Sequence, residues 1–131
     1  MDPYTFDKTA AWMERATKVI PGGIYGHFGP APYVPVSAYP FFSDRAEGAY
    51  FWDVDGNRFI DYMCAYGPMI QGYRNPVVDA AYRAQMEKCD ANSVCAPVMV
   101  ELAEYLTDLI PAADWAFFAK NGADVTNLAV M

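Results

Sequence analysis

The C-terminal stretch from Asp114 to Met131 constrains the fold of this chain more than any other segment. The apolar run Asp114–Ala119 predicts a short buried strand, Asn121-Gly122 predicts a turn, and the residues after this turn have the apolar spacing of a helix. A strand that enters a helix through such a turn exposes backbone N–H groups at the positive end of the helix dipole. The pattern therefore predicts an anion site, most often for a phosphate.

The predicted final helix has only about two turns before Met131, and so short a helix is marginal unless something packs on it. We therefore expect the sequence to stop inside a secondary-structure element. It would then be a portion of a longer chain or a truncated product.

Composition excludes several classes of protein. With 131 residues, 54% hydrophobic and 19% charged, the chain is expected to form one ordinary globular domain with a buried core. A net charge of −7 with scattered Lys and Arg argues against binding to nucleic acid or to an anionic membrane surface. No stretch approaches the roughly 18 apolar residues of a membrane span, and the N-terminus lacks the order of a signal peptide.

The cysteines and the single histidine bear on compartment and metal binding. Cys64, Cys89 and Cys95 are odd in number and contain no C-x-x-C pair, which indicates a reducing, cytoplasmic location. They are interpreted as small buried hydrophobic residues. Because His27 is the only histidine, we expect no metal site.

Proline and glycine punctuate the predicted helices. A helix is predicted over Thr5–Ile20, with Thr5 or Asp7 as its cap and Pro21-Gly22-Gly23 at its end. Pro76 opens a second helix with Asn75 as N-cap, and another is predicted over Pro97–Leu109.

The clearest local pattern is a β-hairpin between Ala49 and Met63. Two β-rich runs, Tyr50–Val54 and Arg58–Met63, flank the turn residues Asp55-Gly56-Asn57. The acidic residues here suggest a calcium loop as the alternative. The EF-hand pattern does not fit, because Gly56 comes too early and no glutamate closes the loop, so the hairpin is favoured.

A long irregular segment, Ile24–Ser43, is rich in Pro, Gly and aromatic residues. Proline disfavours both helix and interior strand, and long loops in compact domains are usually functional or interfacial. Tyr25, His27 and Phe28 are therefore candidates for substrate contact. The alternative, that they pad a subunit surface, remains open, and His27 alone is more often structural than catalytic.

Four segments together resemble a known family. They are Pro21–Gly23, Gly48–Tyr62, Tyr66–Val78 and Asn121–Asp124. The chain resembles the N-terminal part of the class III pyridoxal-phosphate (PLP) aminotransferases, most closely enzymes like glutamate-1-semialdehyde aminomutase. The resemblance implies an α/β chain with the fold type I architecture: an N-terminal arm and small-domain hairpin region over 1–72, and the beginning of the large parallel-sheet, PLP-binding domain over 73–131. It also implies a homodimer.

The resemblance assigns residues to the cofactor and the substrate. Relatives carry Ser-Gly-Thr-Glu where this chain has Asn121-Gly122-Ala123-Asp124, so Asn121, Gly122 and Ala123 are expected to hold the phosphate of PLP, mostly through backbone N–H groups. Tyr66 falls where relatives carry an aromatic residue near the substrate. The lysine that forms the Schiff base and the aspartate that supports the pyridine nitrogen lie beyond this chain in the family, so no catalytic residue is assigned here.

The implied activity is transfer of an amino group from an amine or amino acid donor to a keto or aldehyde acceptor. Aminomutase-type relatives carry a Ser and an Arg where this chain has Gly26 and Gly29. This difference favours an ω-amine, amino sugar or β-amino acid over glutamate semialdehyde. The alternative is a non-catalytic, truncated protein that binds a partner chain or a phosphate ligand.

Overall fold

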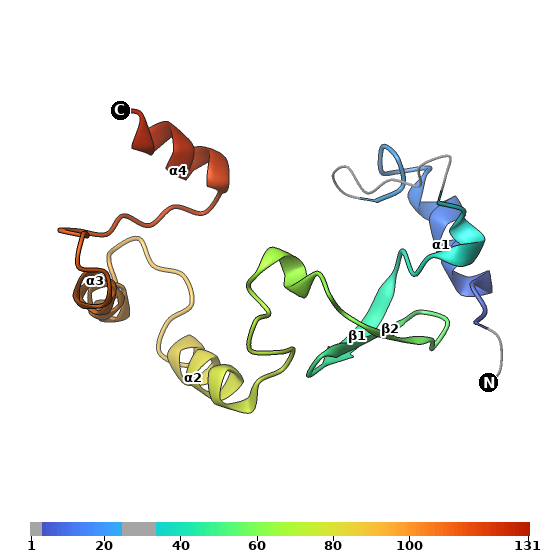
Figure 1. Cartoon of the computed structure of the whole chain (residues 1–131), viewed down its shortest axis with the longest axis horizontal. Helices are drawn as coiled ribbons and strands as arrows, with labels where there is room; N and C mark the ends of the chain where they lie inside the picture. The colour runs from blue at the N-terminus through green and yellow to red at the C-terminus, as the bar shows by residue number, and fades with distance from the viewer. Residues whose placement is uncertain (1–3, 25–33) are drawn as a thin grey trace. The chain divides into compact units, whose positions relative to one another are not determined.

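The computed structural model describes residues 4–24 and 34–131, shown in Figure 1. The length predicted one ordinary domain, but the chain divides into two compact units, Met1–Ala84 and Gln85–Met131. Tyr25, Gly26, His27, Phe28 and Gly29 lie outside the described residues. The predicted division after residue 72 concerns the domains of the family fold and stays a prediction.

The described elements are helices and one small sheet, whose strands follow one another between α1 and α2. The α-helices are α1 (Asp7–Ala16), α2 (Pro76–Met86), α3 (Pro97–Leu109) and α4 (Gly122–Ala129). Two 3₁₀ turns, η2 (Val36–Ala38) and η3 (Cys64–Tyr66), and the strands β1 (Ser43–Glu47), β2 (Tyr50–Asp53) and β3 (Arg58–Ile60) complete the order. The strands form an antiparallel sheet in the order β1-β2-β3.

The predicted hairpin is confirmed as β2 and β3, with Tyr50 opposite Ile60. Its turn is organised by Asp53, whose side chain is 1% exposed. The Asp53 carboxylate accepts hydrogen bonds from the N–H groups of Asp55 (3.0 Å) and Asn57 (2.8 Å) and from the Asn57 side-chain amide (2.7 Å). The Asp53 carboxylate therefore stabilises the turn by accepting its hydrogen bonds.

Strand β1 was not predicted from the sequence. Ser43, placed at the end of an irregular segment, begins this strand, which pairs with β2 and has an irregular register between Ser43 and Arg45. Its sequence, SDRAE, lacks the alternating apolar pattern of a strand, because β1 is a mostly exposed edge strand. Arg45 lies over the ring of Trp52 on β2, 3.5 Å from its centre.

Helix α1 is shorter than the predicted Thr5–Ile20, and the predicted caps are wrong. Phe6 occupies the N-cap position, and no side chain caps the helix from there. Instead the Asp55 carboxylate, from the hairpin turn, accepts hydrogen bonds from the N–H groups of Lys8 (2.7 Å) and Thr9 (2.9 Å) and from the Thr9 hydroxyl (2.7 Å). A cap from so far along the chain cannot be read from local sequence.

The buried side chains of the first unit lie on α1 and at the hairpin turn. Thr9, Met13 and Ala16, all on α1, are buried, as is Asp53. The Asn57 side-chain amide donates to the backbone carbonyl of Thr5 (2.6 Å), which adds a second hydrogen-bonded contact between the hairpin turn and the N-terminal arm. Hydrogen bonds therefore attach the start of α1 and the residue Thr5 to the hairpin turn.

The helices α2, α3 and α4 begin where proline and the Asn-Gly turn predicted them. Asn75 caps α2, since its side-chain oxygen accepts hydrogen bonds from the N–H groups of Val77 (3.0 Å) and Val78 (3.3 Å). Helix α3 has the predicted bounds, and α4 starts at Gly122. None of these three helices has a buried residue. The described segments contain no helix with the length and apolar character of a membrane span.

The predicted buried strand Asp114–Ala119 is wrong for this structure. The segment is not assigned as a strand, and Trp115 is 75% exposed. A strand needs a neighbouring strand to accept and donate its backbone hydrogen bonds. Within residues 4–24 and 34–131, no strand pairs with this segment.

Candidate functional site

The N-terminus of α4 carries the predicted cofactor residues. Asn121 occupies the N-cap with an extended backbone, and Gly122 and Ala123 are the first two helical residues. The Asp124 carboxylate accepts hydrogen bonds from the N–H group (3.3 Å) and the side-chain amide (3.0 Å) of Asn121. In the part of the chain that the structure describes, no hydrogen bond is made by the N–H groups of Gly122 or Ala123.

This helix end fits a phosphate. The first N–H groups of a helix lack intrahelical partners and point along its axis, toward any anion at that end. A Cβ added at Gly122 would meet no atom within 4 Å, and the residue has no positive φ, so neither packing nor backbone conformation requires glycine there. The N–H groups of Gly122 and Ala123, which make no hydrogen bond in the described segments, are the donors that an oxyanion at this end would meet.

Asp124 changes what Asn121 can contribute. Its carboxylate holds the Asn121 amide within the cap, and its negative charge lies in the first turn of the helix. A phosphate at this end would therefore rely on the backbone N–H groups of Gly122 and Ala123. The assignment of these residues to the cofactor stays a prediction.

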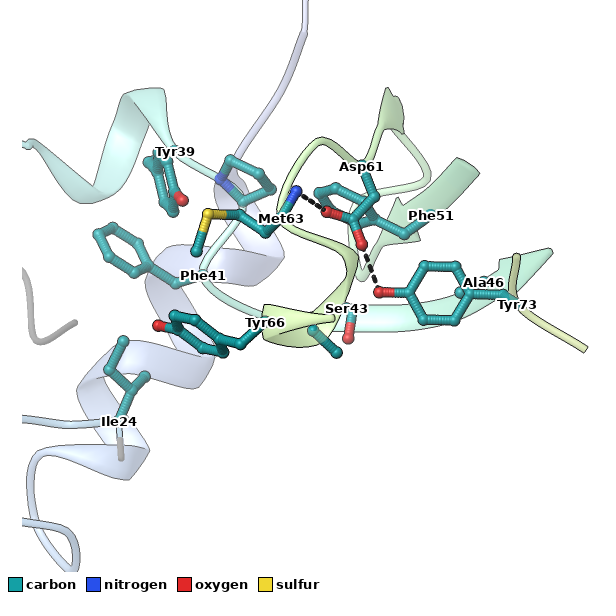
Figure 2. A pocket seen from close by; sticks show the side chains of 12 residues that line it. Ile24, Tyr39, Phe41, Ser43, Ala46, Phe51, Asp61, Met63, Tyr66 and Tyr73 are labelled. Carbon is teal, nitrogen blue, oxygen red and sulfur yellow. Dashed lines mark hydrogen bonds between the residues drawn. The ribbon is translucent and has the colours of Figure 1, made fainter. Parts of the chain in front are cut away.

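A second candidate region is a pocket of about 310 Å³ within the first unit (Figure 2). Its lining is mainly apolar and aromatic, with a few polar groups. The lining residues are Ile24, Tyr39, Pro40, Phe41, Ser43, Ala46, Phe51, Asp61, Met63, Ala65, Tyr66 and Tyr73. Tyr66, the predicted substrate residue, is one of them, and Figure 2 shows its ring near Phe41 and Ile24. Pockets that bind small molecules commonly combine such a lining with a few placed polar groups.

Tyr66 stands on an unusual backbone. Cys64, Ala65 and Tyr66 have φ values of 47°, 48° and 64°, all in the left-handed region. For residues other than glycine this conformation costs roughly 1 to 2 kcal/mol each. Such strain persists only where the surrounding structure restrains the segment, and it gathers at functional sites.

Asp61 supplies part of that restraint. Its carboxylate accepts hydrogen bonds from the N–H groups of Met63 (2.7 Å) and Cys64 (3.2 Å) and from the Tyr73 hydroxyl. The Tyr73 hydroxyl, together with these two backbone N–H groups, outweighs the effect of burial and lowers the pKa of Asp61 below its ordinary value of 3.8. Asp61 therefore stays ionised and continues to accept these bonds at neutral pH.

Sequence reasoning missed the roles of Asp61 and Tyr73. The sequence places Asp61 in a β-rich run, in the family motif and among the acidic residues of the calcium alternative, and it places Tyr73 in the family motif. An aspartate between a strand and a glycine-containing turn is a signal for a side chain that caps the turn. In residues 4–24 and 34–131, no cluster of three or more His, Cys, Asp or Glu could hold a metal ion.

The predicted site residues fall in different parts of the structure. Tyr66 belongs to the first compact unit, and Asn121, Gly122 and Ala123 belong to the second. Tyr25 and His27 lie outside the described residues. The binding roles of all these residues therefore stay predictions.

Comparison with known proteins identifies the family. The family model for class-III aminotransferases matches residues 33–131. The chain belongs to this family. It is 46% identical to the aminopentol aminotransferase of Sphingopyxis macrogoltabida over 90% of this chain, and 37% identical to a glutamate-1-semialdehyde 2,1-aminomutase of Methanothrix thermoacetophila over 98% of it.

The fold agrees with this assignment. The chain superposes on the FumI protein of Sphingopyxis sp. MTA144, solved in its PLP internal aldimine form, with a TM-score of 0.82, 44% identity and coverage of 92% of this chain and 29% of that one. The family resemblance and the fold type I architecture predicted from the motifs are confirmed. This chain spans only part of its relatives: 28% of the length of the aminopentol aminotransferase and 29% of the length of the aminomutase.

Proposed function

We propose that this class-III aminotransferase chain works in a PLP-dependent enzyme that moves an amino group from an amine or amino acid donor to a keto or aldehyde acceptor. Membership of the family over residues 33–131 carries the proposal. The N-terminus of α4, with N–H groups of Gly122 and Ala123 that make no hydrogen bond in the described segments, supports PLP as the cofactor.

The chain contributes binding and orientation. Bound PLP supplies an electron sink for the bond cleavage at the carbon that carries the amine. Gly122 and Ala123 would hold its phosphate through their N–H groups at the positive end of α4, while Asp124 fixes Asn121 at the N-cap. Tyr66, with Tyr25 and His27, would contact the substrate. In this proposal the Schiff-base lysine lies outside these 131 residues.

The donor is proposed to be an amine rather than glutamate semialdehyde. The support is the higher identity to a relative named for aminopentol, 46%, than to the aminomutase above, 37%. The glycines at positions 26 and 29 favour the same choice. The proposed donor is therefore an ω-amine, an amino sugar or a β-amino acid.

A spectroscopic titration tests the proposal. The full natural protein that carries this chain is mixed with PLP, and its visible spectrum is recorded before and after an amine donor is added. A yellow band that bleaches with the donor supports the aminotransferase. A spectrum no different from that of free PLP would instead leave the non-catalytic interaction or phosphate-binding protein, which no observation favours at present.

We further propose that the protein is a cytoplasmic homodimer. Cys64, Cys89 and Cys95 are free thiols in this structure, which fits a reducing compartment. Many large apolar side chains are exposed on α3, among them Val98, Leu102 and Tyr105, and they need further protein to cover them. Light scattering of the full protein, with a mass of two chains expected, tests the dimer.

A further inference from the structure

The left-handed turn Cys64–Tyr66 borders the pocket, and Asp61 and Tyr73 line the same pocket (Figure 2). A turn of three non-glycine residues with positive φ does not hold this conformation by local preference. Something outside the turn has to restrain it if the Tyr66 ring is to keep one position. Asp61 and Tyr73 supply such a restraint, in addition to the backbone hydrogen bonds within the segment.

Asp61 ties the start of the turn to Tyr73. One carboxylate oxygen accepts hydrogen bonds from the N–H groups of Met63 and Cys64, and the other accepts one from the Tyr73 hydroxyl. Figure 2 shows the bonds to Met63 and to Tyr73 on the two sides of the same carboxylate. Hydrogen bonds to an ionised group are stronger than those between neutral groups.

Tyr73 is in turn anchored to the sheet. Its N–H donates to the Gly48 carbonyl (2.8 Å), and the Gly48 N–H donates to the Tyr73 carbonyl (3.0 Å), which forms a bridge to the connection between β1 and β2. A Cβ at Gly72 would lie only 3.2 Å from the Gly48 oxygen, and Gly72 has a φ of +83°. The two backbones therefore approach closely, and Tyr73 is a firm point of attachment.

We propose that Asp61 and Tyr73 are positioning residues for Tyr66: the hydrogen bond between them fastens the left-handed turn to the sheet and holds the Tyr66 ring in the pocket for contact with the substrate. The inference rests on the proposed function, in which Tyr66 touches the amine substrate. Asp61 and Tyr73 act through Tyr66 and not on the reacting atoms.

The test uses the full natural protein and the substitution Tyr73→Phe, which removes the hydroxyl and keeps the ring and the backbone bridge. KM for the amine donor is expected to rise about tenfold, the loss that corresponds to one hydrogen bond to a charged group, while the Kd of PLP stays unchanged. Tyr4→Phe is the matched control. It removes a tyrosine hydroxyl as well, but this one donates to the backbone carbonyl of Arg58 and not to Asp61, so KM should be unchanged.

A double-mutant cycle separates positioning from a general structural effect. In the Tyr66→Ala background, Tyr73→Phe should no longer change KM, because the residue that it positions is gone. An equal tenfold increase in both backgrounds would overturn the proposal, and so would an unchanged KM in Tyr73→Phe alone.

A second readout does not depend on activity. Hydrogen exchange at the amides of Met63 and Cys64 should become about tenfold faster in Tyr73→Phe than in wild type and stay at the wild-type rate in Tyr4→Phe. Unchanged exchange in Tyr73→Phe would overturn the restraint itself. If wild type shows no transamination but exchange responds as expected, the proposed function fails and the restraint of the turn stands.

Discussion

Asp55 stabilises the N-terminal unit by capping a helix that lies almost fifty residues earlier in the chain. Its carboxylate accepts hydrogen bonds from two backbone N–H groups and one hydroxyl at the start of α1. We expect Asp55→Ala to lower the free energy of unfolding by about 1 to 3 kcal/mol, because the cap is lost. Urea unfolding followed by tryptophan fluorescence, to which Trp12 and Trp52 of the first unit contribute, measures this change. Asp44→Ala, on exposed β1, is the control and should have little effect.

The same contact predicts a pH dependence. Burial opposes the charge of Asp55, but the hydrogen bonds from Thr9 and Lys8 and the nearby Lys8 ammonium outweigh it and lower its pKa from the ordinary value of 3.8. A group with a lowered folded-state pKa stabilises the fold above its unfolded pKa and loses this contribution as pH falls. The stability difference between wild type and Asp55→Ala should therefore be full at neutral pH and shrink below pH 3.8. A difference that persists in strong acid would contradict this role.

Gly122 and Ala123 allow a paired test of the phosphate site. Gly122→Ala places a methyl group in open space at the end of α4 and should weaken PLP binding about tenfold without loss of stability. Ala123→Thr restores the hydroxyl that relatives carry and should tighten binding. Spectroscopic titration of the full protein with PLP measures both. Unchanged affinity in both variants would place the phosphate elsewhere.

At the scale of the element, the hairpin turn depends on one backbone conformation. Gly56 has a φ of +92°, and a Cβ there would meet no atom within 4 Å. Gly56→Ala should therefore cost roughly 1 to 2 kcal/mol through conformation alone. Thermal unfolding measured by circular dichroism tests this value. Gly122→Ala, which has no positive φ, is the matched control, and an equal loss in both variants would show that conformation is not the cause.

At the scale of the whole molecule, burial is uneven between the two units. Thr9, Met13, Ala16, Gly23 and Asp53 are buried and all belong to the first unit, whereas α3 and α4 bury no residue. Native amides exchange slowly where buried contacts hold the backbone. In the 131-residue chain alone, we expect α1 and the hairpin to be protected from hydrogen exchange and α3 to be weakly protected.

The full natural protein provides the comparison for this prediction. If further protein covers the exposed apolar residues of α3, its amides should gain protection there, and binding of a hydrophobic dye should fall relative to the 131-residue chain. Equal exchange in α3 in both proteins would show that its apolar face stays uncovered.

Sequence by itself determined the features whose physics is local. The hairpin turn follows from Asp55-Gly56-Asn57, the starts of α2 and α3 follow from Pro76 and Pro97, and the start of α4 follows from the Asn-Gly turn, because turn and cap chemistry acts over a few residues. The same local motifs were specific enough in combination to indicate the family.

Only the tertiary structure decided the features that join distant residues. β1 is a strand because β2 offers it a partner, and α1 begins at Asp7 because Asp55, far along the chain, caps it. The turn at Tyr66 is held through Tyr73, which the bridge to Gly48 fixes. The converse case is Asp114–Ala119, whose apolar sequence predicts a strand. Backbone hydrogen bonds between strands need two partners, so a strand-like sequence becomes a strand only where a second strand lies beside it.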